Sequence, residues 1–157
     1  MSSVNEILSE YGITEDLLSP SERSALDTDG YIVLQNLIDE RWLQLLRIAF
    51  ERECEKDGKA AVVKESGTRH IPDLVNRDSV FEGTYTHPRI LAAVYHILRT
   101  RFRIGKIGGR DPLPGYGQQG LHADWPARYK GEPFRAVTTI WLLDDFQREN
   151  GATRVVP

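Results

Sequence analysis

The sequence predicts an α+β fold in which a layer of helices is followed along the chain by an antiparallel sheet. Residues 1–100 contain capping signals followed by apolar residues at three- and four-residue spacing. Residues 101–157 instead contain β-branched and alternating runs separated by turns. Helices first and strands second are typical of α+β proteins. At 157 residues, the chain is expected to form a single domain with these two parts.

The helical layer is expected to begin with a short helix at 4–11 and a better-defined one after Ser19. Ser19 suits the N-cap, Pro20 the first helical position, and Glu22 the third, which together form a capping box. The apolar spacing carries this second helix to about Asp27.

A short buried strand and the longest helix are expected next. Residues 31–34 are an apolar, partly β-branched run that follows Gly30. Asp39 then caps a long helix that Gly58 ends. The apolar stripe of that helix consists of Trp42, Leu45, Leu46, Ala49, Phe50 and Cys54.

Weaker signals fill the middle of the chain. Residues 60–63 form a strand or a loop edge, 68–74 a short strand that Pro72 interrupts, and 78–85 a helical turn. Pro88 then opens another helix. Its inner face is expected to hold Ile90, Leu91, Val94, Ile97 and Leu98.

Strand patterns dominate after residue 100. Residues 101–109 alternate between two faces, and the Gly- and Pro-rich residues 108–117 predict a loop. Residues 134–143 are rich in β-branched and aromatic side chains and predict the strongest strand. Turn signals at 149–151 precede a further strand at 152–157.

Composition excludes several classes of protein. With 40% hydrophobic residues the chain can build a core, and a net charge of −3 without a basic cluster gives nucleic-acid binding no electrostatic support. No secretory signal or bilayer-length apolar run is visible, which argues against a membrane protein. The single Cys54 is expected to pack in a helix, and its use fits a reduced cytoplasm.

The most informative motif is the His-x-Asp pair formed by His122 and Asp124. Residues two apart on an extended strand point to the same face, so the imidazole and the carboxylate could converge on one ion. Together they supply two thirds of the 2-His-1-carboxylate triad that holds non-haem Fe(II). The alternative is that His122 caps a loop and Asp124 closes a turn before Pro126.

Four motifs in order resemble the phytanoyl-CoA dioxygenase family, over the chain from about Leu26. These motifs lie at 29–34, 122–125, 139–145 and 149–157. The resemblance implies a double-stranded β-helix, or jelly roll, preceded by helices. It also implies Fe(II) as cofactor, 2-oxoglutarate as cosubstrate, and hydroxylation of an unactivated C–H bond in a small organic substrate.

By motif position, the resemblance makes His122 and Asp124 metal ligands. It places Trp141 beside the cosubstrate with Thr139 on the same face, and lets Gln119 donate a hydrogen bond into the pocket. A plain core tryptophan is the alternative for Trp141. A carboxylate at position 124 favours hydroxylation, because halogenating relatives have a small residue there.

The family pattern also contains groups that lie outside this sequence. Its Val-Val-Pro stretch normally continues into Gly-Ser-His, followed by a second ligating His and a basic residue that clamps 2-oxoglutarate. Here the sequence reaches Pro157, and His70, His87 and His96 all precede the pair. The expectation is therefore a jelly roll whose C-terminal strands are missing, and residues 1–157 alone are expected to be inactive.

Two other classes stay open at this point. One is a catalytically inactive remnant or interaction protein that keeps the helices and the sheet. The other is a cupin-like metal protein that uses a different divalent ion. The sequence leaves open the substrate and the oligomeric state, and titrations with iron and 2-oxoglutarate would separate the three classes.

Overall fold

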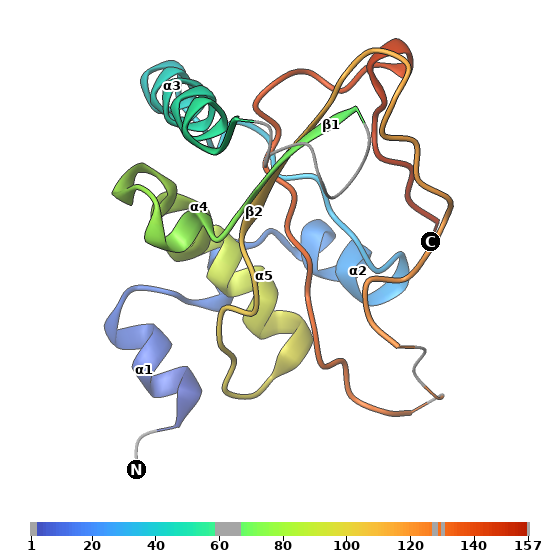
Figure 1. Cartoon of the computed structure of the whole chain (residues 1–157). Coiled ribbons are helices and arrows are strands. Elements are labelled where there is room, and N and C mark those ends of the chain that lie inside the picture. Colours follow the sequence, from blue (N-terminus) through green and yellow to red (C-terminus); the bar gives the residue numbers. More distant parts are fainter. Residues whose placement is uncertain (1–2, 59–66, 127–128, 130, 157) are drawn as a thin grey trace.

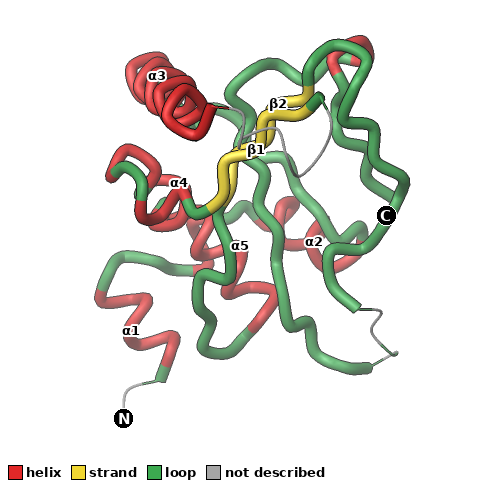
Figure 2. The backbone as a smooth tube through the Cα atoms, viewed as in Figure 1, coloured by secondary structure: helices red, strands yellow, loops and turns green. Residues whose placement is uncertain are grey.

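The computed structural model describes residues 3–58, 67–126, 129 and 131–156. Its elements are helices and a two-stranded antiparallel sheet, so the predicted α+β class is confirmed (Figures 1 and 2). In Figure 1, α3 (Glu40–Asp57) and α4 (Gly83–Thr86) lie to the left of the short sheet, and the chain after β2 (Gly108–Pro112) runs mainly along its right. The predicted strand at 60–63 lies outside the described residues.

The first two helices begin with the local chemistry that the sequence indicates. Helix α1 (Val4–Glu10) has a capping box formed by Ser3 and Glu6. Helix α2 (Pro20–Thr28) has the predicted one, in which Ser19 Oγ accepts a hydrogen bond from the Glu22 N–H at 3.2 Å. The Glu22 carboxylate accepts in return from the Ser19 N–H at 2.8 Å. Two otherwise unpaired donors are thereby satisfied.

The longest helix, α3 (Glu40–Asp57), confirms its predicted ends. The Asp39 carboxylate accepts the Trp42 N–H at 2.7 Å, and Gly58 ends the helix with a φ of 51°. Most of the predicted stripe is buried, but Leu45 is 46% exposed and does not belong to it. Glu53 is buried instead, because cationic side chains around it compensate its charge.

The sheet pairs β1 (Thr68–Pro72) with β2 (Gly108–Pro112), and Thr68 lies opposite Pro112. The first strand was predicted, but the second falls where the sequence indicated a loop. A Cβ atom on Gly109 would lie 2.3 Å from the Phe50 ring. The glycines therefore let this strand approach α3 closely, which a strand of larger residues could not do.

Short helical elements connect the main ones. The predicted helical turn at 78–85 is confirmed by η4 and α4, and Pro88 opens α5 as predicted. The face that α5 buries includes Ala92 and His96, and Leu91 and Ile97 from the predicted inner face are partly buried against the same core. The remaining elements are η1 (Glu15–Leu17), η3 (Leu74–Asn76), η4 (Ser79–Phe81), α4 (Gly83–Thr86), α5 (Pro88–Leu98) and η5 (Arg148–Asn150).

Two apolar clusters form the core. The first joins α3 to β1, η3 and η4, and its buried members are Leu46, Ala49, Phe50, Cys54, Ile71, Leu74 and Phe81. The second lies between the N-terminal helices and α5, and its buried members are Ile13, Leu18, Leu26 and Ala92. Leu143, far along the chain, packs against the first cluster, so the C-terminal part is attached to the helical layer.

Several predicted strands do not form ladders within the described part of the chain. Residues 31–34, 102–107, 134–143 and 152–156 are neither helix nor strand. Strand pairing needs a neighbour that offers its own N–H and C=O groups, and the described residues contain only the β1–β2 pair. None of the helices described is both long and apolar enough to cross a bilayer.

Candidate metal centre

The chain that follows β2 brings the two predicted ligands together. His122 Nε2 lies 3.3 Å from Asp124 Oδ1, and the two side chains are 55% and 60% exposed. The segment is irregular rather than a strand, so the convergence comes from a local fold of the loop. The two side chains therefore converge, although the predicted strand with its shared face is not present.

The other ring nitrogen of His122 fixes how the imidazole is oriented. Nδ1 lies 2.8 Å from the carbonyl oxygen of Gly120. A carbonyl oxygen only accepts hydrogen bonds, so Nδ1 carries the hydrogen and donates it. In the neutral ring, Nε2 then directs a lone pair at the Asp124 carboxylate. A proton on Nε2 makes this contact an ion pair with Asp124. One imidazole nitrogen and one carboxylate oxygen directed at one point are also donors that a divalent metal ion can accept.

A third residue, which the sequence did not single out, completes the contacts of the carboxylate. The Thr138 hydroxyl donates to Asp124 Oδ2 at 2.9 Å. Oδ1 is left facing His122. The signal for Thr138 was weak, because Thr139 stands beside it and the alternation of a strand alone does not say which of the two faces the pair.

Trp141 lies against the helical layer instead of the pair. Its indole N–H donates to the Thr84 carbonyl at 3.0 Å. Its ring makes an edge contact with Trp42, with centroids 5.4 Å apart, and lies 5.9 Å from the His87 ring. These contacts are those of a packed core tryptophan, the alternative that the sequence left open. Its place beside a cosubstrate stays a prediction.

The other predicted cosubstrate residues lie at the surface. Thr139 and Gln119 are both exposed. The structure does not bring Trp141 to the His122–Asp124 pair, and the roles of Thr139 and Gln119 toward 2-oxoglutarate likewise stay predictions.

The remaining described histidines have structural partners. Burial, with the nearby Arg89 charge, lowers the pKa of His87, whose Nδ1 accepts the Arg89 N–H at 3.2 Å. His96 bridges Asp27 and Arg99. Among residues 3–58, 67–126, 129 and 131–156, no group of three or more His, Cys, Asp or Glu side chains is placed to hold a metal. The candidate centre thus has two protein donors.

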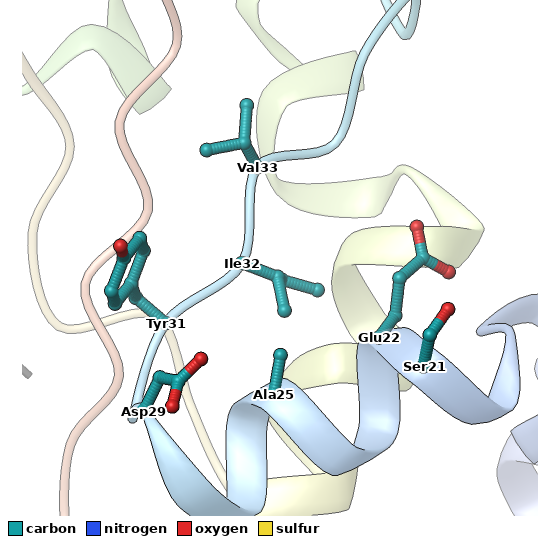
Figure 3. A pocket seen from close by; sticks show the side chains of 7 residues that line it. All are labelled: Ser21, Glu22, Ala25, Asp29, Tyr31, Ile32 and Val33. Carbon is teal, nitrogen blue, oxygen red and sulfur yellow. The ribbon is translucent and has the colours of Figure 1, made fainter.

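An open groove elsewhere on the surface has no metal-binding character. It lies between α2 and residues 31–33, with Ile32 directed over Ala25 (Figure 3). The Glu22 carboxylate at its edge already accepts hydrogen bonds from the Ser19 N–H and the Arg89 guanidinium. The Glu22 carboxylate is therefore already used in helix capping and in an ion pair.

A mixed helix-and-sheet chain with a converging imidazole and carboxylate is a candidate non-haem metal protein. The model of the family described as phytanoyl-CoA dioxygenase (PhyH) matches residues 26–157. The chain belongs to this family, as the four motifs had indicated.

Individual relatives agree with this assignment. The chain is 27% identical to "Dioxygenase trt7" of Aspergillus terreus over 156 residues, which cover 89% of this chain and 54% of the relative. It is 25% identical to "Phytanoyl-CoA dioxygenase, peroxisomal" of Rattus norvegicus, covering 94% of this chain and 49% of the relative. The chain thus spans about half the length of these relatives. No solved structure matches it.

Proposed function

We propose that this chain carries part of the active site of an Fe(II)- and 2-oxoglutarate-dependent dioxygenase, an oxidoreductase that hydroxylates an unactivated C–H bond of a small organic substrate. The observation that carries the proposal is the arrangement of His122 Nε2 and Asp124 Oδ1, which lie 3.3 Å apart at the surface of the described chain. Membership of the phytanoyl-CoA dioxygenase family supports iron as the ion.

In this proposal His122 and Asp124 bind Fe(II) through Nε2 and Oδ1. The Gly120 carbonyl holds the imidazole by accepting from Nδ1–H, which leaves Nε2 as the nitrogen that binds the ion. The carboxylate also lowers the net charge of the bound ion. When bound, the iron supplies oxygen activation coupled to oxidation of 2-oxoglutarate, and the protein supplies binding and orientation.

The proposal extends to the architecture around the pair. We propose a single domain in which residues 1–100 form the helical layer and 101–157 the first strands of a jelly roll. A facial triad needs a second His beside His122 and Asp124. We also propose that the protein acts on a small molecule, without nucleic acid or membrane, in a reducing compartment such as the cytoplasm.

The metal centre can be tested directly on residues 1–157. Mn(II) is a paramagnetic stand-in for Fe(II), and the electron paramagnetic resonance signal of free Mn(II) measures how much is bound. We expect His122→Ala and Asp124→Ala each to weaken binding by at least 10-fold. Asp16→Ala, which removes an exposed carboxylate from η1, is the matched control and should bind as the parent does. If the parent and the three variants all bind Mn(II) equally, the proposed metal centre is rejected.

The reaction is tested by succinate release from 2-oxoglutarate with Fe(II) and ascorbate. It should be measured on residues 1–157 and on any longer gene product that contains them. Turnover that disappears in His122→Ala supports the proposal. Oxygenase activity that does not depend on 2-oxoglutarate would overturn the proposal. Turnover that His122→Ala leaves unchanged would also overturn it.

A further inference from the structure

We propose that Thr138 is a positioning residue for the metal centre: its hydroxyl holds the Asp124 carboxylate so that Oδ1 alone faces the ion. This inference rests on the proposed function and assigns a role that the His-x-Asp motif does not contain. The observation behind it is the 2.9 Å hydrogen bond from Thr138 Oγ1 to Asp124 Oδ2.

The two carboxylate oxygens of Asp124 have separate partners. Oδ1 lies 3.3 Å from His122 Nε2, and Oδ2 accepts from Thr138. A carboxylate that gives one oxygen to a side-chain donor presents the other as a monodentate ligand. Bound in this way, Asp124 occupies one coordination position of the ion rather than two, which leaves more positions for small ligands.

An exposed aspartate needs such a partner to stay in one orientation. The Asp124 side chain is 60% exposed and lies in an irregular loop, so little packing restrains it. Thr138 is suited to restrain it, because a β-branched side chain has few χ1 rotamers and its hydroxyl moves little relative to the backbone. The hydrogen bond therefore fixes the position of the Asp124 carboxylate relative to the backbone of residues 134–143.

That backbone is itself attached to the helical layer close to Thr138. Three residues along, the Trp141 indole donates to the Thr84 carbonyl at 3.0 Å. Two residues further, the Leu143 carbonyl accepts from Arg47 Nε at 2.9 Å. The helices thus position residues 141–143, and through Thr138 they position a metal ligand 14 residues earlier in the sequence.

The test compares variants that differ only in the hydroxyl. Thr138→Val keeps the β-branched shape and removes the donor, whereas Thr138→Ser keeps the donor. Thr100→Val, at an exposed threonine after α5, is the matched control. Mn(II) affinity of residues 1–157 is measured by paramagnetic resonance, and a thermal melt of each variant checks that the fold is intact.

We expect Thr138→Val to weaken Mn(II) binding by roughly 10–100-fold, the usual effect of removing a group that orients a metal ligand. Thr138→Ser should restore affinity to within a few-fold of the parent, and Thr100→Val should not change it. The resonance spectrum of bound Mn(II) should also change in Thr138→Val, because an untethered carboxylate alters the symmetry at the ion.

The outcomes separate this inference from the proposed function. If Asp124→Ala loses Mn(II) binding while Thr138→Val retains it, the centre stands and the role of Thr138 is rejected. If Thr138→Ser fails to restore affinity, the hydroxyl is not the cause and the inference is also rejected. If Asp124→Ala binds as the parent does, or the parent binds no Mn(II), both proposals fall.

Discussion

Phe50 lies where helix α3 packs against the β1–β2 sheet. It is 8% exposed, its ring occupies the space that a side chain at position 109 would need, and the Arg69 guanidinium lies 5.8 Å from its centroid. Phe50→Ala should therefore lower the free energy of unfolding by about 3–5 kcal/mol. Ile48→Ala on the same helix, where the side chain is 61% exposed, should change it by less than about 0.5 kcal/mol. Urea denaturation measures both changes. A loss of unfolding free energy in Phe50→Ala smaller than a third of the expected value would contradict the predicted stripe.

Two buried threonines allow a second comparison at the residue scale. Thr68 is fully buried, and its hydroxyl has no hydrogen-bond partner among the residues that the structure describes. The Thr84 hydroxyl, also buried, donates to the Phe81 carbonyl at 2.7 Å. Thr68→Val should leave the free energy of unfolding unchanged or raise it, whereas Thr84→Val should lower it by about 1 kcal/mol. Similar losses in both variants, measured by thermal melting, would mean that the Thr68 hydroxyl has a partner such as a water.

At the scale of elements, an ion-pair network fastens the end of α3 to η3 and makes stability depend on pH. The Lys56 ammonium lowers the pKa of the buried Glu53, and the Arg77 guanidinium, 2.8 Å away, lowers the pKa of Asp57. The unfolded chain therefore takes up these protons first as the pH falls. Stabilisation should be complete above about pH 4–4.5, the ordinary pKa range, and lost as the pH drops through the lowered folded values.

Urea denaturation between pH 7 and pH 3 checks this prediction. Arg77→Met should reduce the dependence of unfolding free energy on pH below pH 5, because both Glu53 and Asp57 lose a cationic partner. Arg103→Met, at an exposed position outside the network, is the control. If the unfolding free energy of Arg77→Met depends on pH below pH 5 as that of the parent does, these ion pairs do not cause the pH dependence.

The helices could be predicted from the sequence more completely than the strands, for a physical reason. A capping box such as Ser19 with Glu22, or an end such as Gly58, is decided within a few residues. A strand depends on a partner that can lie anywhere in the chain, so the strongly β-prone residues 134–143 form no strand ladder within the described part. Conversely, β2 includes Gly109, where the ring of Phe50, distant in sequence, leaves no room for a side chain.

For the whole molecule, Arg47 connects the helical layer to the C-terminal part of the chain. Its guanidinium donates to the Leu143 carbonyl and lies 2.9 Å from the Asp144 carboxylate. Arg47→Met should speed hydrogen exchange in residues 138–145, while costing less than about 1 kcal/mol of global stability because the ion pair is solvated. Arg41→Met, exposed on the same helix, should leave exchange unchanged. Unchanged exchange in Arg47→Met would mean that Trp141 and Leu143 suffice as anchors.

The candidate site was predictable in part, and the same division between local and distant contacts explains why. The spacing of His122 and Asp124 predicted that their side chains converge, and the loop brings Nε2 and Oδ1 to 3.3 Å from each other. Thr138 escaped notice because its contact depends on how two segments lie side by side. The environment of Trp141 is likewise set by its neighbours Trp42 and Thr84, which no local pattern relates to it.

The exposed apolar side of residues 134–142 has a consequence for behaviour at high concentration. Ile140 and Leu142 are 57% and 40% exposed, on a β-prone segment that forms no strand ladder within the described part. Such a segment readily adds strands from other molecules, so the apparent molecular mass measured by light scattering should rise with protein concentration. Ile140→Lys should suppress this self-association, since a charge at the segment opposes strand addition. Ile48→Lys should not suppress it, although that side chain is equally apolar, because the backbone of α3 is already hydrogen-bonded within the helix.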